Sequence, residues 1–347
     1  MPSTASPGRR ARAFRLAMRL DGRHFPLRPA GLAAAIFTLL CTTLPAGAQV
    51  GFPPPPPRIS PAAGVIDMHV HPDPDVFGRA LNDTELAMVA RRKGMRGIVL
   101  KNHVVTTADR AALAMQAVPG IEIWGGIVLN NAVGGINPSA VEWMHRMSGG
   151  RGKIVWLPTF DADKHVKTLV DKAKSGIVVA PNGQVTPQME EVLKIIAREN
   201  LVLATGHVHP EEVVAVTRRA RELGVRNILV THGLTNIPGL STAQAKEVVA
   251  MGAKIEICYL QFMTGPNAQY DWMKHWDRVD AKAVAQAVRD LGADALVLST
   301  DLGQQGMMVP PDGIENQVAA VRAAGVSQAD IDKMMKRNPA QLLGLAN

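Results

Sequence analysis

The stretch Val65-Ile66-Asp67-Met68-His69-Val70-His71-Pro72 begins as an apolar strand and ends in two histidines separated by one residue. Because successive side chains of a strand point to opposite faces, His69 and His71 share a face, with Asp67 one step earlier on it. Two imidazoles at the end of a strand suit a divalent metal such as zinc. A bare H-x-H pair also occurs by chance, so the metal interpretation depends on what the later strands carry.

The first 48 residues have the composition of a signal peptide. They hold seven arginines, no lysine and one acid, and they continue into the apolar run 31–40 and the small-residue pattern Ala46-Gly47-Ala48. The apolar run is too short to span a bilayer comfortably. We therefore predict cleavage after Ala48, a mature chain that begins at Gln49, and an exported protein, periplasmic or secreted, without a membrane segment. An uncleaved N-terminal anchor is the alternative.

Charge and cysteine content narrow the function classes. The net charge of +8 comes mostly from the leader, because its removal leaves 31 basic and 29 acidic residues. No basic stripe with interleaved aromatic residues is present, so nucleic-acid binding is not expected. Cys258 is the only cysteine after residue 48, which excludes an intramolecular disulfide in the mature chain.

Two regions follow the leader. Residues 49–63 include five consecutive prolines, 53–57, and predict an extended linker outside the fold. Residues 64–347 are expected to form one domain, which is long enough to build its own core.

Short apolar runs alternate with amphipathic segments after residue 64. Helix start signals between them include Asn82 with Glu85, Thr186 before Pro187, and Ser241. The pattern predicts an α/β fold of the (β/α)8 TIM-barrel type, which typically takes ~250 residues. The predicted strands lie near residues 65–69, 97–101, 121–128, 153–157, 201–206, 227–231, 254–258 and 295–300. A doubly wound open sheet is the rival, but no G-x-G-x-x-G follows the first strand.

Residues 176–185 lengthen the connection between the fourth and fifth predicted strands. They are rich in β-branched residues and contain Asn182-Gly183, a dipeptide typical of tight hairpin turns. We predict a small β-hairpin inserted there.

The barrel prediction places chemistry at the carboxyl ends of the strands. Those ends carry His69, His71, Lys101, Asn130, Asn131, Thr159, Asp161, His207, His209, His232, Glu256 and Asp301. A single histidine after a strand is often an ordinary loop residue, and Asp301 by itself would serve as a turn cap. Repeated metal-type side chains at successive strand ends instead predict a metal centre.

Over residues 64–347, the chain resembles the amidohydrolase superfamily of metal-dependent hydrolases. Within that superfamily it looks like an uncharacterised amidohydrolase-like branch. The motifs that carry the resemblance are Asp67-Met68-His69-Val70-His71, Leu203-Ala204-Thr205-Gly206-His207, Val230-Thr231-His232, Leu298-Ser299-Thr300-Asp301 and the ending Asn338-Pro339-Ala340-Gln341-Leu342-Leu343-Gly344-Leu345. It implies metal ligation by His69, His71, His207, His232 and Asp301, with Asp301 also as the catalytic base. Substrate contacts are expected from Asn130, Asp161, His165 and Glu256. His103 and His209 are assigned to supporting or loop roles ahead of metal ligation.

One feature departs from the superfamily pattern. Two-metal members usually bridge their ions with a carboxylated lysine or a glutamate from the fourth strand, and here that strand ends Trp156-Leu157-Pro158-Thr159. Lys101, at the end of the second strand, is the only lysine at the end of an early strand. Two interpretations stay open: Lys101 is carboxylated and joins two metals, or the site holds one metal and Lys101 contacts an anionic substrate group.

The expected function is hydrolysis of an amide, ester or lactone bond of a small molecule, with one or two divalent ions, most simply zinc. A bound dication lowers the pKa of water to about 7 and polarises a carbonyl, and Asp301 would take the proton. A metal-dependent lyase, either a decarboxylase or a hydratase, and a non-catalytic exported metal-binding protein are the alternatives. The expected partner is a small-molecule substrate, and a homo-oligomer is compatible with the sequence.

Overall fold

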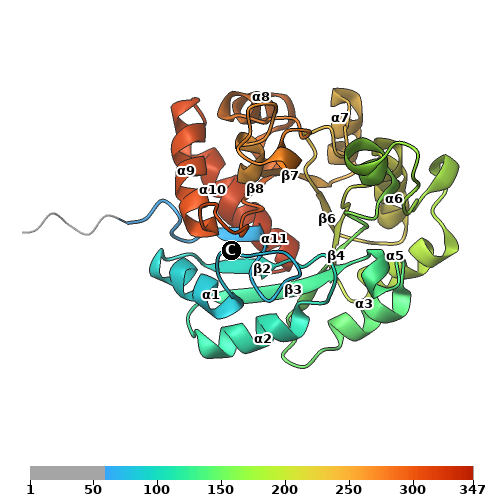
Figure 1. Ribbon diagram of the computed structural model, residues 1–347, viewed down its shortest axis with the longest axis horizontal. Helices are drawn as coiled ribbons and strands as arrows, with labels where there is room; N and C mark the ends of the chain where they lie inside the picture. The colour runs from blue at the N-terminus through green and yellow to red at the C-terminus, as the bar shows by residue number, and fades with distance from the viewer. Residues whose placement is uncertain (1–58, 347) are drawn as a thin grey trace, which may run out of the picture. The chain divides into compact units, whose positions relative to one another are not determined.

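The computed structural model describes residues 59–346. Eight parallel strands follow one another in sequence order and curve into a barrel surrounded by helices (Figure 1). They are β1 (Ile66–Val70), β2 (Gly97–Leu100), β3 (Glu122–Val128), β4 (Gly152–Trp156), β5 (Val202–Ala204), β6 (Asn227–Val230), β7 (Lys254–Cys258) and β8 (Leu296–Ser299). The predicted (β/α)8 barrel is confirmed, and each predicted strand overlaps an observed one.

The connections after the strands carry the helices. The α-helices are α1 (Asp83–Arg92), α2 (Ala108–Ala117), α3 (Pro138–His145), α4 (Asp163–His165), α5 (Pro187–Arg198), α6 (Pro210–Glu222), α7 (Thr242–Ala250), α8 (Ala281–Leu291), α9 (Pro310–Ala323), α10 (Gln328–Asp332) and α11 (Asn338–Leu343). Short 3-10 or π turns are η1 (Asn131–Val133), η2 (Val166–Val170), η3 (Pro181–Gly183), η4 (Tyr259–Phe262), η5 (Asp271–Met273), η6 (Ala293–Ala295) and η7 (Lys333–Arg337).

The predicted helix starts are confirmed. Asn82 and Glu85 form a reciprocal capping box at α1, and Ser241 forms one at α7. Thr186 caps α5 with its side chain, and a proline occupies the first turn of that helix. Each cap satisfies backbone N–H groups that have no partner within the helix.

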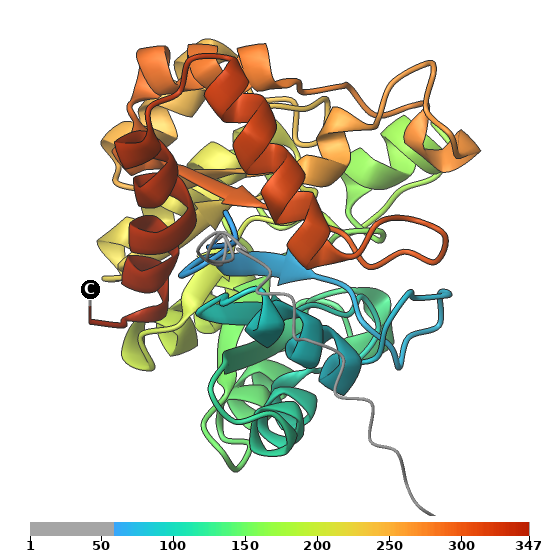
Figure 2. The same cartoon turned by 90° about the vertical axis from the view of Figure 1, so that its left-hand side faces the viewer.

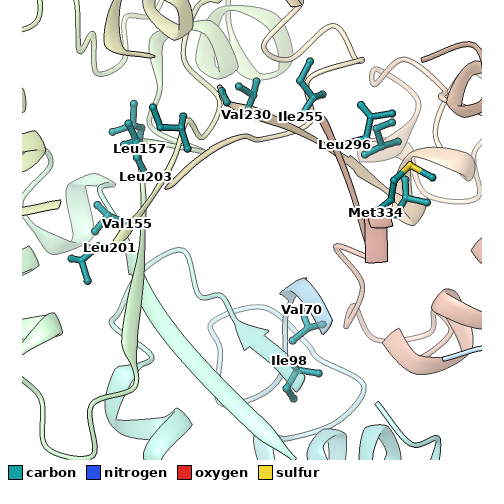
Figure 3. Packing of buried hydrophobic residues seen from close by; sticks show 14 of the residues in the cluster. Val70, Ile98, Val155, Leu157, Leu201, Leu203, Val230, Ile255, Leu296 and Met334 are labelled. Atoms are coloured by element: carbon teal, nitrogen blue, oxygen red, sulfur yellow. The ribbon is translucent and has the colours of Figure 1, made fainter. Parts of the chain in front are cut away.

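Alternate residues of the strands enter two apolar layers. Ile98 and Ile255 belong to the outer layer, between the strands and the surrounding helices (Figure 3). Val99 and Trp156 belong to the inner layer, together with Leu342 of α11. Because side chains alternate along a strand, Lys101 after β2 and Glu256 in β7 point toward the barrel interior.

The barrel closes between its first and last strands. The Asp301 N–H donates to the His69 carbonyl at 2.8 Å, and the His71 N–H donates to the Leu302 carbonyl at 2.9 Å. The buried carboxylate of Asp67 accepts the Thr300 N–H at 3.0 Å. The C-terminal helices lie beside β1 (Figure 2), and α11 also contacts β6 and β8. This closure holds the H-x-H segment and Asp301 next to each other.

The predicted hairpin at residues 176–185 is wrong. Asn182 and Gly183 do form a turn with positive φ values of 52° and 76°, closed by the Thr186 N–H donating to the Val179 carbonyl at 3.0 Å. The flanking segments do not pair as strands, because the Val179 and Ala180 N–H groups donate to the Glu212 side chain, at 2.6 and 2.8 Å. A carboxylate from α6 therefore takes the place of a partner strand.

The predicted signal peptide lies outside the described residues, as does most of the predicted linker. Within residues 59–346, no helix is both long enough and apolar enough to cross a membrane.

Candidate metal centre

Three acceptor-type atoms converge at the mouth of the barrel. His69 Nε2 lies 3.2 Å from His71 Nε2 and 3.0 Å from Asp301 Oδ1, and His71 Nε2 also lies 3.0 Å from Asp301 Oδ1. All three residues are buried. His69 lies in β1 and His71 directly follows that strand, whereas Asp301 follows β8, so barrel closure assembles the group.

The spacing of these atoms fits the inner ligand shell of a divalent cation. Ligands 2.0–2.2 Å from one ion stand about 3.0–3.5 Å from each other in tetrahedral or octahedral geometry. His69 Nε2 and Asp301 Oδ1 are within that range of each other and of His71 Nε2. One cation between these converging imidazole and carboxylate atoms would satisfy all three at once, so the residues present fit a metal.

Two further atoms that could bind a metal lie near His69. Its Nδ1 lies 3.3 Å from Glu256 Oε2 and 3.7 Å from Cys258 Sγ. The Glu256 contact favours the tautomer that carries its proton on Nδ1, which leaves Nε2 free to bind a metal. His69, His232, Cys258 and Asp301 also form a set whose ligand atoms all lie within 4.8 Å of one another.

Gln261 determines the orientation and tautomer of His232. The Gln261 Oε1 accepts the Cys258 N–H at 3.2 Å, so its Nε2 is the atom that faces His232 Nδ1, at 2.9 Å. An amide nitrogen only donates, which makes Nδ1 the acceptor and leaves the proton on His232 Nε2. That nitrogen lies 3.5 Å from Asp301 Oδ2. The two oxygens of Asp301 therefore face different partners.

Lys101 completes the inner part of the centre. Its Nζ lies 3.0 Å from His69 Nε2 and 5.5 Å from the Trp156 ring centroid, and the whole side chain is buried. Burial lowers the pKa of Lys101, although the carboxylates of Asp301 and Glu256 oppose the shift. A lowered pKa makes the neutral amine accessible.

A second group of histidines lies beside the first. His165 Nδ1 and His207 Nδ1 are 2.9 Å apart with stacked rings, and the ring centroids of His207 and His232 are 5.2 Å apart. The buried Nε2 of His207 has no hydrogen-bond partner within residues 59–346. His103 stacks on Phe160 and hydrogen-bonds to Thr159 through Nδ1 at 2.9 Å.

Burial and the negative charge of Asp301 set the protonation states. Burial lowers the pKa of His232 to about 4 and holds that of His71 well below its usual range. Burial also disfavours the charged form of His69, but the carboxylates of Asp301 and Glu256 together outweigh it and raise the pKa of His69. Burial would raise the pKa of Asp301, yet His69 and the imidazole hydrogen bonds hold it well below the ordinary value. At neutral pH the site thus offers an ionised carboxylate and mostly neutral imidazoles, the forms that bind metals.

Two of the site residues have unusual backbone conformations. His232 and Asp301 have φ values of +54° and +56°, in the left-handed region. Non-glycine residues seldom adopt this conformation, and where it occurs it is concentrated at functional positions.

A cavity of about 530 Å³ opens above these residues. His71, Lys101, His207, His232 and Asp301 line its floor. Its walls include aromatic side chains from Phe77, Phe160, Trp272 and Trp276. The volume lies within the range of small-molecule sites.

A model for a family of unknown function, DUF6282, matches residues 64–256, which is more than half of the chain. The chain belongs to this family. Among curated proteins, none matches the sequence.

Solved structures share the barrel. An organophosphorus hydrolase from Deinococcus radiodurans is similar with a TM-score of 0.54 at 16% identity, over 85% of this chain and 100% of that one. A mutant PTE-like lactonase from the same organism gives 0.53 at 15% identity, over 83% and 98%. A structure described as organophosphate hydrolysis activity engineered from a weak promiscuous lactonase template gives 0.53 at 16% identity, over 82% and 97%. These similarities confirm the fold that the amidohydrolase resemblance implied.

The structure brings the predicted metal-type residues together. His69, His71, Lys101 and Asp301 form the inner group, and His207 and His232 lie beside it. His209 lies apart, with Nε2 2.8 Å from Asp163 Oδ2.

The four predicted substrate contacts occupy different places. His165 lines the cavity, whereas Glu256 lies against His69. Asn130 donates to Thr159 Oγ1 at 2.9 Å, and Asp161 Oδ2 accepts the Asn131 N–H at 2.8 Å. Asn130 and Asp161 therefore connect the loops after β3 and β4.

Several lining residues were not predicted. Arg79 reaches the cavity from the loop after β1, and Gln261, Trp272 and Trp276 reach it from the loop after β7. That loop joins β7 to α8 over more than twenty residues, and its length at the carboxyl end of a strand is the signal that would have identified it.

Proposed function

We propose that this protein is an exported metal-dependent hydrolase that cleaves an amide, ester or lactone bond of a small molecule. The convergence of His69 Nε2, His71 Nε2 and Asp301 Oδ1 at 3.0–3.2 Å, under a cavity of about 530 Å³, carries the proposal. The printed activities of the structural neighbours, organophosphate hydrolysis and lactonase activity, are consistent with it.

His69, His71 and Asp301 would hold a divalent cation, zinc being the simplest choice for this ligand set. Such a cation supplies Lewis-acid polarisation of the scissile group and makes water more acidic. His207 Nε2, buried and without a partner among the described residues, is a further candidate ligand.

Asp301 is the proposed catalytic base. Its carboxylate is ionised at neutral pH, because the imidazole contacts hold its pKa low against the effect of burial. Oδ1 faces His69 and His71, and Oδ2 lies 3.5 Å from His232 Nε2. The N–H at His232 Nε2 therefore faces Oδ2 and orients this oxygen, the one left to accept a proton from water.

Lys101 has two proposed roles that metal content distinguishes. Its burial-lowered pKa favours the amine that carbon dioxide needs, and carbamate formation with loss of a proton would give a group able to bridge two ions. As an unmodified side chain, it would face an anionic group of the substrate.

The test is turnover of a panel of amides, esters, lactones and phosphotriesters by the metal-loaded protein, with products identified. We expect hydrolysis of at least one class, and a loss of more than about 100-fold in His71→Ala. His145→Ala is the matched control, because His145 lies on α3 and pairs with Glu199 outside the cavity. Products of decarboxylation or hydration would identify a lyase, and absence of turnover in a metal-loaded protein would contradict the enzyme proposal.

A further inference from the structure

Apolar side chains are concentrated at the cavity mouth. Phe77, Phe160, Val170 and Trp272 line the cavity and are also among the exposed large apolar residues, with exposed fractions of 37–63%. Large apolar groups that face solvent around a concave site usually meet an apolar ligand. The apolar wall therefore predicts a substrate with an aromatic or aliphatic body.

Arg79 adds a fixed positive charge to the same cavity. Asp75 Oδ2 accepts hydrogen bonds from Arg79 Nε at 2.9 Å and Nη2 at 2.7 Å. Asp75 is itself anchored, because its Oδ1 accepts the Val76 N–H at 2.6 Å. Asp75 accepts from only some of the five N–H donors of the guanidinium group, and this ion pair fixes the direction of the other N–H groups.

Arg79 lines the same cavity as His71 and Asp301. Among the cavity-lining residues, Arg79 carries a guanidinium charge and Asp301 is the only carboxylate. The lining therefore favours a negative charge on the ligand.

We propose that the substrate is an amphiphilic anion: an apolar or aromatic body in the mouth, and a carboxylate or similar anionic group bound by Arg79. Arg79 is then a specificity-determining residue that places the scissile bond over His71 and Asp301. The ligand is a substrate only if the proposed function holds, but the binding described here is measurable without turnover.

Binding of three small probes to the metal-loaded protein tests the proposal. They are 2-phenylethanesulfonate, the neutral 2-phenylethanol and the anion ethanesulfonate, and a sulfonate is chosen because it is a weak metal ligand. We expect the first to bind at least about tenfold more tightly than either of the others, since a charge-assisted hydrogen bond adds to apolar burial.

Variants locate the anion. Arg79→Met should reduce sulfonate binding to the level of the alcohol, and Arg79→Lys should give an intermediate affinity. Arg146→Met is the matched control, because Arg146 also pairs at i,i+4 and lies over an aromatic ring, but directly after the outer helix α3. Asp75→Asn keeps the Arg79 guanidinium and removes only the negative charge that it pairs with. This variant should therefore retain sulfonate binding even if the loop after β1 is perturbed.

Two outcomes of the binding experiments would overturn the proposal. One is equal binding of the sulfonate and the alcohol by the wild-type protein. The other is sulfonate binding that survives in folded Arg79→Met but disappears on metal removal, which would place the anion on the metal. If the protein hydrolyses neutral substrates and Arg79→Met does not change the rate, this proposal is refuted and the hydrolase proposal stands. If the sulfonate binds as expected but no substrate is turned over, this binding proposal stands and the hydrolase proposal is contradicted.

Discussion

The carboxylate of Asp301 faces two sets of partners. Oδ1 lies 3.0 Å from Nε2 of both His69 and His71, and Oδ2 lies 3.5 Å from His232 Nε2. Its left-handed backbone, with φ of +56°, is stabilised by the N–H bond to His69. These contacts give one residue both a metal-binding atom and a proton-accepting atom.

Asp301→Asn should therefore fold but lose turnover by about 100-fold or more, because an amide cannot accept the proton. Circular dichroism and steady-state kinetics on the metal-loaded variant check this. Turnover close to wild type would remove Asp301 from the role of base.

Gln261 is predicted to keep His232 from binding metal through Nε2. Gln261→Glu retains an acceptor for the Cys258 N–H but places an acceptor against His232 Nδ1, which should move the imidazole proton there and free Nε2. We expect higher zinc affinity in this variant, measured by competition with a chromogenic chelator. Gln304→Glu is the control, because this substitution adds the same charge beside the site without contacting His232. Gln304 itself donates to the Asp301 carbonyl. An equal increase in both variants would mean that charge alone, and not the tautomer, is responsible.

Lys101 is tested by the number of ions per chain. If a carboxylated Lys101 joins two metals, Lys101→Ala should fall toward one ion, with partial recovery in small carboxylic acids. Elemental analysis of wild type and variant gives the number directly. A wild-type protein that never exceeds one ion per chain would exclude bridging and assign Lys101 to the substrate.

At the scale of elements, Asp163 at the start of α4 joins the loop after β4 to the loop after β5. Burial alone would raise its pKa, but hydrogen bonds from Lys167, His209 and the Gly176 N–H lower it to about 2. Because the folded-state pKa lies below the unfolded value, the stabilisation is complete above about pH 4. It is lost as pH falls toward 2.

Asp163→Asn should then lower the free energy of unfolding by about 1–2 kcal/mol at pH 7, discounting for the solvent exposure of Lys167. The difference from wild type should shrink to roughly half near pH 3. Urea unfolding at the two pH values measures it. A difference that does not change with pH would show that packing, not ionisation, is responsible.

The strands were predictable because their signal is local. Most strands are buried on both faces and read as short apolar runs, as Ile98-Val99-Leu100 does in β2. The hairpin prediction at 176–185 failed because its outcome depends on Glu212, about thirty residues later, which takes the N–H groups of Val179 and Ala180. No local pattern shows that competition.

At the scale of the whole molecule, the barrel explains which parts of the site could be predicted. It brings every strand end to one mouth, so His69, His71, Lys101 and Asp301 could be grouped from their positions after predicted strands. Arg79 and Trp276 lie on long loops, and the path of such a loop is not encoded in strand order. The protonated nitrogen of His232 depends on a contact from Gln261 that only coordinates reveal.

The metal content of the purified protein tests the central claim most directly. After saturation with zinc and exhaustive dialysis, we predict at least one ion per wild-type chain by elemental analysis. His71→Ala should lose most of the bound zinc, and His145→Ala should retain it. A folded wild-type protein that keeps no divalent ion under these conditions, or a His71→Ala variant that binds zinc as well as wild type, would contradict the account.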